Sequence, residues 1–137
     1  MADNQRKARL IAEIGQNLAA ETEFSKKGLL MIAGVAKGYL AISVFSDRGP
    51  HVAYRVTKYS RYENLLNELW SMEPLSKRWE EVEFFLKGNE FQTKFVYFED
   101  IDPDDLTIDR WHQAAEKYFG GKPIKYPSWD DSNSWTL

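Results

Sequence analysis

The segment "GLLMIAGVAKGYLAISVFS" (28–46) contains two apolar runs separated by Lys37-Gly38. Each run has the length of a β-strand, and a lysine-glycine pair suits a tight turn because glycine tolerates positive φ. The segment therefore predicts a β-hairpin with strands at about residues 29–36 and 39–46. Strands that arrive as hairpins, instead of alternating singly with helices, favour an antiparallel sheet.

Two later segments extend this sheet. The alternating pattern of "HVAYRV" (51–56) predicts a half-buried third strand. Residues 79–98 predict a second hairpin, with strands at 79–87 and 90–98 around a Gly88-Asn89 turn. Because the last strand is partly apolar on both faces, we expect it to be central or covered.

Three helices are predicted around the sheet. The N-terminal one has apolar residues at helical spacing, namely Leu10, Ile11, Ile14 and Leu18. A second begins near Ser60, which stands at capping-box spacing from Glu63, and it ends before Pro74. A third covers about residues 108–119 and stops at Gly120-Gly121. We predict an α+β fold with an antiparallel sheet of four or five strands and helices at the N-terminus, in the middle and near the C-terminus.

Size and composition favour one globular domain. The 137 residues are enough to bury a sizeable core, so we expect residues 1–137 to form a single domain with an irregular tail from about 122. The chain has no cysteine, which suits the cytosol. Charges interrupt the N-terminal apolar residues, and no window reaches the roughly 18 apolar residues of a membrane span. We therefore predict a cytoplasmic protein that does not enter membranes.

The segment "EDIDPDDLTID" (99–109) concentrates negative charge. Six of its eleven residues are acidic: Glu99, Asp100, Asp102, Asp104, Asp105 and Asp109. Residues 99–137 hold nine Asp/Glu and four Lys/Arg, whereas residues 1–98 hold twelve and fourteen. Such a field repels nucleic acid and attracts basic proteins. One interpretation is a contact surface for a basic partner; the other is structural, with Asp105 or Asp109 capping the last helix or complementing its dipole.

A calcium site is disfavoured in this segment. Asp100, Asp102 and Asp104 have the spacing that opens an EF-hand loop. The sixth position of the loop is Asp105 where glycine is needed, and the twelfth is Trp111 where a glutamate is needed. We therefore predict no metal.

Signs of catalysis are weak. His51 and His112 lie on different predicted elements, with no serine or cysteine motif near either, and residues 33–38 do not fit a nucleotide-binding glycine loop. Glu80 and Glu81 are adjacent on a strand, so they point to opposite faces. We predict no enzyme and no cofactor. Four basic residues near the third strand are interpreted as a solvated face: Arg48, Arg55, Lys58 and Arg61.

The C-terminal tail contains two tryptophans, Trp129 and Trp135. A large aromatic ring near a chain end either docks into a groove of its own protein or contacts a partner. Asp130 and Asp131 follow Trp129 directly, and this mixture of anchor and charge suits a protein contact. Trp129, Asp130 and Asp131 therefore join the six acidic residues as candidate partner-binding residues.

The second half of the chain resembles a known family. The segments "KGNEFQTKFVYFEDID" and "RWHQAAEKYFGGKPIKYP", together with the order of elements, look like the YezG-like immunity proteins. The resemblance covers about residues 60–127 best, and its strongest parts are "FVYFED" (95–100) and "YFG" (118–120).

This resemblance implies a cytoplasmic, non-enzymatic antitoxin. Such proteins neutralise a cognate polymorphic toxin domain that is secreted or delivered by contact, often a nuclease, as in contact-dependent growth inhibition. It carries over no catalytic residues, and binding surfaces differ between members. The expected mechanism is occlusion of a basic toxin cleft by the acidic surface.

Two other functions stay open. One is a small ligand-binding or enzymatic α+β domain with an aromatic-lined pocket, built from Tyr39, Phe45, Trp79, Phe84, Phe91 and Tyr97. The other is an adaptor that presents the same acidic surface to an unrelated basic protein.

Overall fold

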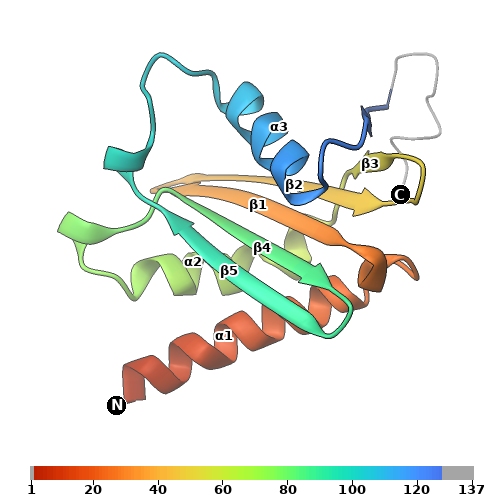
Figure 1. Ribbon diagram of the computed structural model, residues 1–137. Helices are drawn as coiled ribbons and strands as arrows, with labels where there is room; N and C mark the ends of the chain where they lie inside the picture. The colour runs from red at the N-terminus through yellow and green to blue at the C-terminus, as the bar shows by residue number, and fades with distance from the viewer. Residues whose placement is uncertain (1, 128–137) are drawn as a thin grey trace.

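A six-stranded sheet lies between helices on both of its faces (Figure 1). The computed structural model describes residues 2–127. The helices are α1 Ala2–Ala19, α2 Glu63–Ser71 and α3 Thr107–Tyr118. The strands are β1 Leu29–Ala36, β2 Tyr39–Asp47, β3 Val52–Arg55, β4 Glu81–Lys87, β5 Glu90–Val96 and β6 Ile124–Lys125. The α+β class is confirmed, but the described residues form a mixed sheet of six strands, ordered β5-β4-β1-β2-β3-β6, instead of four or five antiparallel ones.

The hairpin that opens the sheet is confirmed. β1 and β2 pair antiparallel from Leu29↔Ser46 to Ala36↔Tyr39, and Gly38 in the turn has a φ of +74°. The other edge of β1 pairs with β4. Residues 29–35 are all buried, because helices cover both faces of this central strand.

The larger core lies on the face that carries α1 and α2. Leu10, Ile14 and Leu18 follow one stripe of α1, as their spacing predicts, and all three are buried against the sheet. Trp79 is fully buried in the same core. Gly15 allows the ring of Phe91 to approach α1, since a Cβ at this position would stand 3.0 Å from the ring. This face is closed by two helices.

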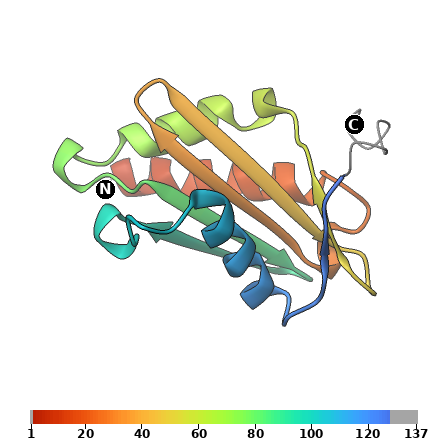
Figure 2. The same cartoon turned by 90° about the horizontal axis from the view of Figure 1, so that it is seen from above.

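A smaller core lies on the opposite face, under α3. Trp111, Ala115 and Phe119 are its α3 contribution, and they pack against apolar residues of β1 and β2. Gly34 of β1 lies beneath the indole of Trp111, where a Cβ would stand 3.4 Å from the ring. Figure 2 looks onto this face, with α1 and α2 visible behind the sheet. A single helix covers it, so parts of the sheet beside α3 stay uncovered.

Two predictions about strands hold only in part. β5 is an edge strand instead of a central one, but one of its two faces is covered. Its aromatic residues Phe91 and Phe95 pack on the larger core, while Gln92 and Lys94 face solvent on the other side. Within residues 122–127 the tail is not wholly irregular, because Ile124 pairs with Val52 in the parallel strand β6. Two residues of pairing are too short to produce a periodic pattern that a sequence would show.

The second helix begins later than the capping-box spacing predicts. Ser60 lies in a 3₁₀ turn, Tyr59–Arg61, and α2 starts at Glu63 with Tyr62 before it and no side-chain cap. The buried hydroxyl of Tyr62 donates a hydrogen bond to Glu21 beyond the end of α1. This tertiary contact fixes the backbone just before α2, two residues after the expected cap.

Candidate functional site

The acidic segment forms the connection between β5 and α3. After β5 the chain makes a 3₁₀ turn, Phe98–Asp100, and then a loop to Thr107. Asp100 accepts a hydrogen bond from the backbone N–H of Tyr97 at 3.2 Å, and Asp102 accepts one from that of Asp104 at 2.9 Å. Short local bonds of this kind shape a loop without tertiary packing. The six acidic side chains are all exposed, so their charge faces solvent.

Structural roles account for three of the six carboxylates, since Asp100 and Asp102 accept the loop's backbone hydrogen bonds. Asp109 lies in the first turn of α3, where its charge complements the helix dipole. Asp105 does not cap the helix, because Leu106 occupies that position and makes no side-chain bond. Nor do the carboxylates converge: within residues 2–127 no group of three or more His, Asp or Glu side chains is placed to hold a metal ion.

Apolar side chains are interleaved with the carboxylates. Phe98 is 72% exposed, Leu106 65% and Ile108 70%. Leu75, which precedes β4, is exposed beside this segment and lines a surface groove together with Phe98 and Glu99. We call the six carboxylates and the three apolar residues Phe98, Leu106 and Ile108 the acidic-apolar loop. The charges of this loop were predicted from the sequence, whereas the exposure of its apolar residues was not, although they stand in the same stretch.

The three remaining candidate residues, Trp129, Asp130 and Asp131, lie outside the described residues. The acidic-apolar loop therefore contains every described residue of the predicted partner-binding set. The structure brings these residues together because they are neighbours in sequence.

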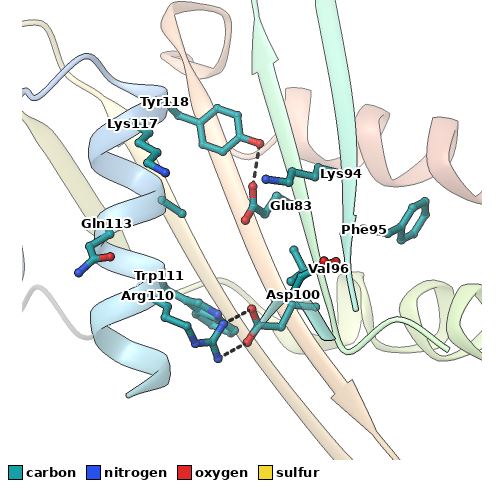
Figure 3. Close-up of a pocket in the computed structure, with 12 residues that line it drawn as sticks. Glu83, Lys94, Phe95, Val96, Asp100, Arg110, Trp111, Gln113, Lys117 and Tyr118 are labelled. Carbon is teal, nitrogen blue, oxygen red and sulfur yellow. Dashed lines mark hydrogen bonds and ion pairs between the residues drawn. The ribbon is translucent and has the colours of Figure 1, made fainter. Parts of the chain in front are cut away.

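A polar groove of about 660 Å³ lies between α3 and the strands β4 and β5 (Figure 3). Glu81 and Glu83 stand on its floor, two positions apart on one face of β4. Arg110 donates two hydrogen bonds to Glu81, at 2.7 and 2.8 Å, and Tyr118 donates one to Glu83 at 2.8 Å. Figure 3 shows the Tyr118 bond across the groove.

These contacts attach α3 to the sheet and shift the pKa values of both donor side chains. The Glu81 carboxylate raises the pKa of Arg110, and burial together with Glu83 raises the pKa of Tyr118. Both carboxylates already have protein donors, which favours a structural role. The Glu80-Glu81 pair did not predict this groove; the sequence signal for it is the spacing of two in "EVE" (81–83), which places both glutamates on one face of a strand.

The basic residues near β3 are only in part the predicted solvated face, to which the exposed Lys58 belongs. Arg55 and Arg61 lie 3.6 and 3.5 Å from Glu21, whose side chain is 2% exposed. Thr57 and Tyr62 donate hydrogen bonds to the same carboxylate, and burial with this contact raises the pKa of Tyr62. A buried carboxylate requires such partners. Two of the four cations are therefore committed to holding the end of α1 near the start of α2.

A second groove, of about 420 Å³, lies on the other flank of α3. Its walls are mostly aromatic and come from β2, β3, α3 and the segment after β6. His112 is there and is half exposed: its Nδ1 lies 2.8 Å from the hydroxyl of Tyr126. We call this the aromatic groove. Of the six aromatics expected to line a ligand pocket, only Phe45 is in it, while Trp79 and Phe84 are buried in the larger core.

A scan of the sequence against protein-family models and a search of curated proteins found no match. The resemblance to YezG-like immunity proteins therefore stays a prediction from residues. No helix in the described part of the chain is long and apolar enough to cross a membrane.

Proposed function

We propose that the protein is a cytoplasmic, non-enzymatic immunity protein that binds a cognate bacterial toxin domain, most simply a nuclease. The observation that carries this proposal is the acidic-apolar loop. Its six carboxylates are exposed, and Phe98, Leu106 and Ile108 are exposed among them. Solvated charge alone would not require exposed apolar side chains at the same place.

The composition of the loop suits a protein partner. Exposed apolar side chains provide the area that a contact buries, while surrounding charges steer the partner and fix its orientation. Within residues 99–127 there are seven Asp/Glu and four Lys/Arg, and Arg110 is already paired with Glu81. The excess negative charge favours a basic surface.

The mechanism would be occlusion. A nuclease holds a polyanionic substrate in a basic cleft, so a loop rich in carboxylates can occupy the same cleft. The two ends of the loop are fixed, because β5 is paired with β4 and Arg110 attaches α3 to Glu81. A loop with fixed ends loses less conformational entropy on binding than a free tail would.

The proposal is tested by co-expression with the product of the adjacent upstream gene. We expect the two proteins to co-purify, the chain to block the toxic activity, and the affinity to fall at least about tenfold from low to high salt. Failure of the folded chain to bind or to protect would contradict the proposal. Binding to an unrelated basic protein, with no toxic activity to block, would support the adaptor instead.

The aromatic groove favours a second candidate, a small ligand-binding domain. Its volume of about 420 Å³ lies in the range that small-molecule sites occupy. The groove offers a ligand few polar groups, since His112 and Tyr126 already bond each other. A screen of apolar small molecules, read by a rise in melting temperature, tests this candidate, and micromolar binding by a neutral ligand would favour it.

A further inference from the structure

The aromatic groove has preformed walls. Tyr126 packs against Tyr54 with ring centroids 5.2 Å apart, and against His112 with centroids 5.8 Å apart. The hydrogen bond between His112 and the Tyr126 hydroxyl holds this wall against α3. A side chain that enters the groove would therefore meet ordered rings and would not have to order them first.

The floor and one rim of the groove suit a bulky apolar group. Ala41 and Ser43 of β2 line it, and these small side chains leave space between β2 and α3. Ile108, which belongs to the acidic-apolar loop, forms the rim on α3 and is largely exposed. The groove and the loop are thus one continuous surface that shares Ile108.

Negative charge borders the same rim. Asp109 and Glu116 lie on the exposed surface of α3 beside the ridge that Ile108 and His112 form. Glu116 lies 3.4 Å from Nε2 of His112. A neutral apolar ligand would not use these charges, whereas a basic peptide segment would use both the groove and the charges.

We propose that the aromatic groove takes one large aromatic or branched apolar side chain of the partner, flanked in the partner's sequence by lysine or arginine. The apolar side chain is the anchor, and the flanking cations lie against Asp109 and Glu116. This inference rests on the proposed function and specifies the chemistry of the surface that the toxin domain presents. Central anchors with a charged surround are the usual arrangement of binding hot spots.

The first test uses three short peptides with the full chain. They are acetylated and amidated Lys-Trp-Lys, Lys-Ala-Lys and Glu-Trp-Glu, titrated while the ring signals of Trp111 and His112 are followed by NMR. We expect saturable shifts of both rings with Lys-Trp-Lys, and an affinity at least about tenfold weaker for each of the other two peptides. Equal binding of Glu-Trp-Glu, or no shift with Lys-Trp-Lys, would overturn the proposal.

Two variants change the groove. Ser43→Phe fills it, and Ile108→Ala removes its exposed rim without touching the core. The matched control is Gln113→Phe, which adds the same ring on the polar-groove side of α3. We expect both groove variants to lose binding of Lys-Trp-Lys while the control keeps it, with melting temperature measured for each. Unchanged binding by Ile108→Ala and Ser43→Phe would contradict the inference.

The outcome is separable from that of the proposed function. If the upstream product binds the chain and Ser43→Phe and Ile108→Ala leave its affinity unchanged, the immunity function stands and the anchor proposal fails. A tenfold loss with both variants, but not with Gln113→Phe, supports the anchor. If Lys-Trp-Lys shifts the rings only after Trp129→Ala, the chain's own tail competes for the groove, which overturns a partner anchor.

Discussion

The two faces of the sheet are covered by helices to different extents. On one face, α1 and α2 close a large apolar core in which Trp79 is fully buried. On the other face, α3 alone covers a smaller core, and grooves remain on both of its flanks. This difference teaches that stability and recognition are divided between the faces: one is closed by the chain itself, whereas the other leaves surface for a partner.

The largest effect on stability is expected from replacing a buried tryptophan, and each face of the sheet has one to compare. Trp79→Ala should decrease the free energy of unfolding by an amount near the upper end of about 3–5 kcal/mol, because the larger core encloses the whole side chain. Trp111→Ala should cost about 1 kcal/mol less, since Trp111 borders grooves into which neighbours can relax. Urea denaturation of both variants checks the order. Equal losses would mean that α3 packs as tightly as α1 and α2.

The next largest effect on stability is expected from the polar side chains that attach α3 to the sheet. Arg110→Ala leaves the buried Glu81 carboxylate without its two hydrogen bonds, so we expect a loss of about 3 kcal/mol. Replacing both residues, Arg110→Ala with Glu81→Ala, should recover part of this loss because no buried charge is left. Denaturation of the single and double variants measures the coupling. A double variant at least as unstable as Arg110→Ala would contradict the account.

Each face has one tyrosine whose hydroxyl donates to a glutamate, Tyr62 to Glu21 and Tyr118 to Glu83. Both tyrosine pKa values are raised in the folded chain, so the folded state keeps protons that the unfolded state releases above about pH 10. Their contribution to stability is present below that pH and is lost as the pH rises, by at most about 1.4 kcal/mol per pH unit for each tyrosine.

A conservative variant of each tyrosine measures how much its face of the sheet contributes to this pH dependence. Tyr62→Phe and Tyr118→Phe should each flatten the decline above pH 10 to a similar extent, because both hydroxyls keep their protons in the folded state while the unfolded tyrosines release theirs. Unfolding measured from pH 8 to pH 11 provides the comparison. A slope that neither variant changes would show that these hydroxyls do not control alkaline stability.

The smallest effect on stability is expected in the acidic-apolar loop. Phe98→Ser and Leu106→Ser remove exposed side chains, so the free energy of unfolding should change by no more than about 0.5 kcal/mol. Their affinity for the toxin domain should nevertheless fall, as the contact loses apolar area. Thermal unfolding and isothermal titration separate the two results. A clear loss of stability would show that the loop is part of the core.

Local patterns predicted most of the fold. The spacing of Leu10, Ile14 and Leu18 identified the helix and its buried stripe, and the Lys37-Gly38 turn identified the central hairpin. The edge position of β5 and the pairing of β6 with β3 depend on contacts between segments distant in sequence. No local period encodes such contacts.

The site was predictable to a different extent. Exposure of the six carboxylates followed from their density in a loop. The burial of Glu21, which pairs with Arg55 and Arg61, required the end of α1 to meet the segment before α2. The aromatic groove likewise joins side chains from four separate segments. Among these side chains, only Phe45 had been predicted to line a pocket.

The central claim is that the acidic-apolar loop binds a basic toxin domain. The most direct measurement is the affinity for the upstream gene product of two triple charge reversals. One changes the loop, Glu99→Lys with Asp104→Lys and Asp105→Lys. The other is the matched control elsewhere on the surface, Glu13→Lys with Glu23→Lys and Glu90→Lys.

We expect the loop triple to lose at least about tenfold in affinity and most of its salt dependence, while its melting temperature stays unchanged. The control triple has the same net charge, so it should lose much less. An equal loss in both would show that only net charge matters. No loss in the loop triple would contradict the assignment of this surface.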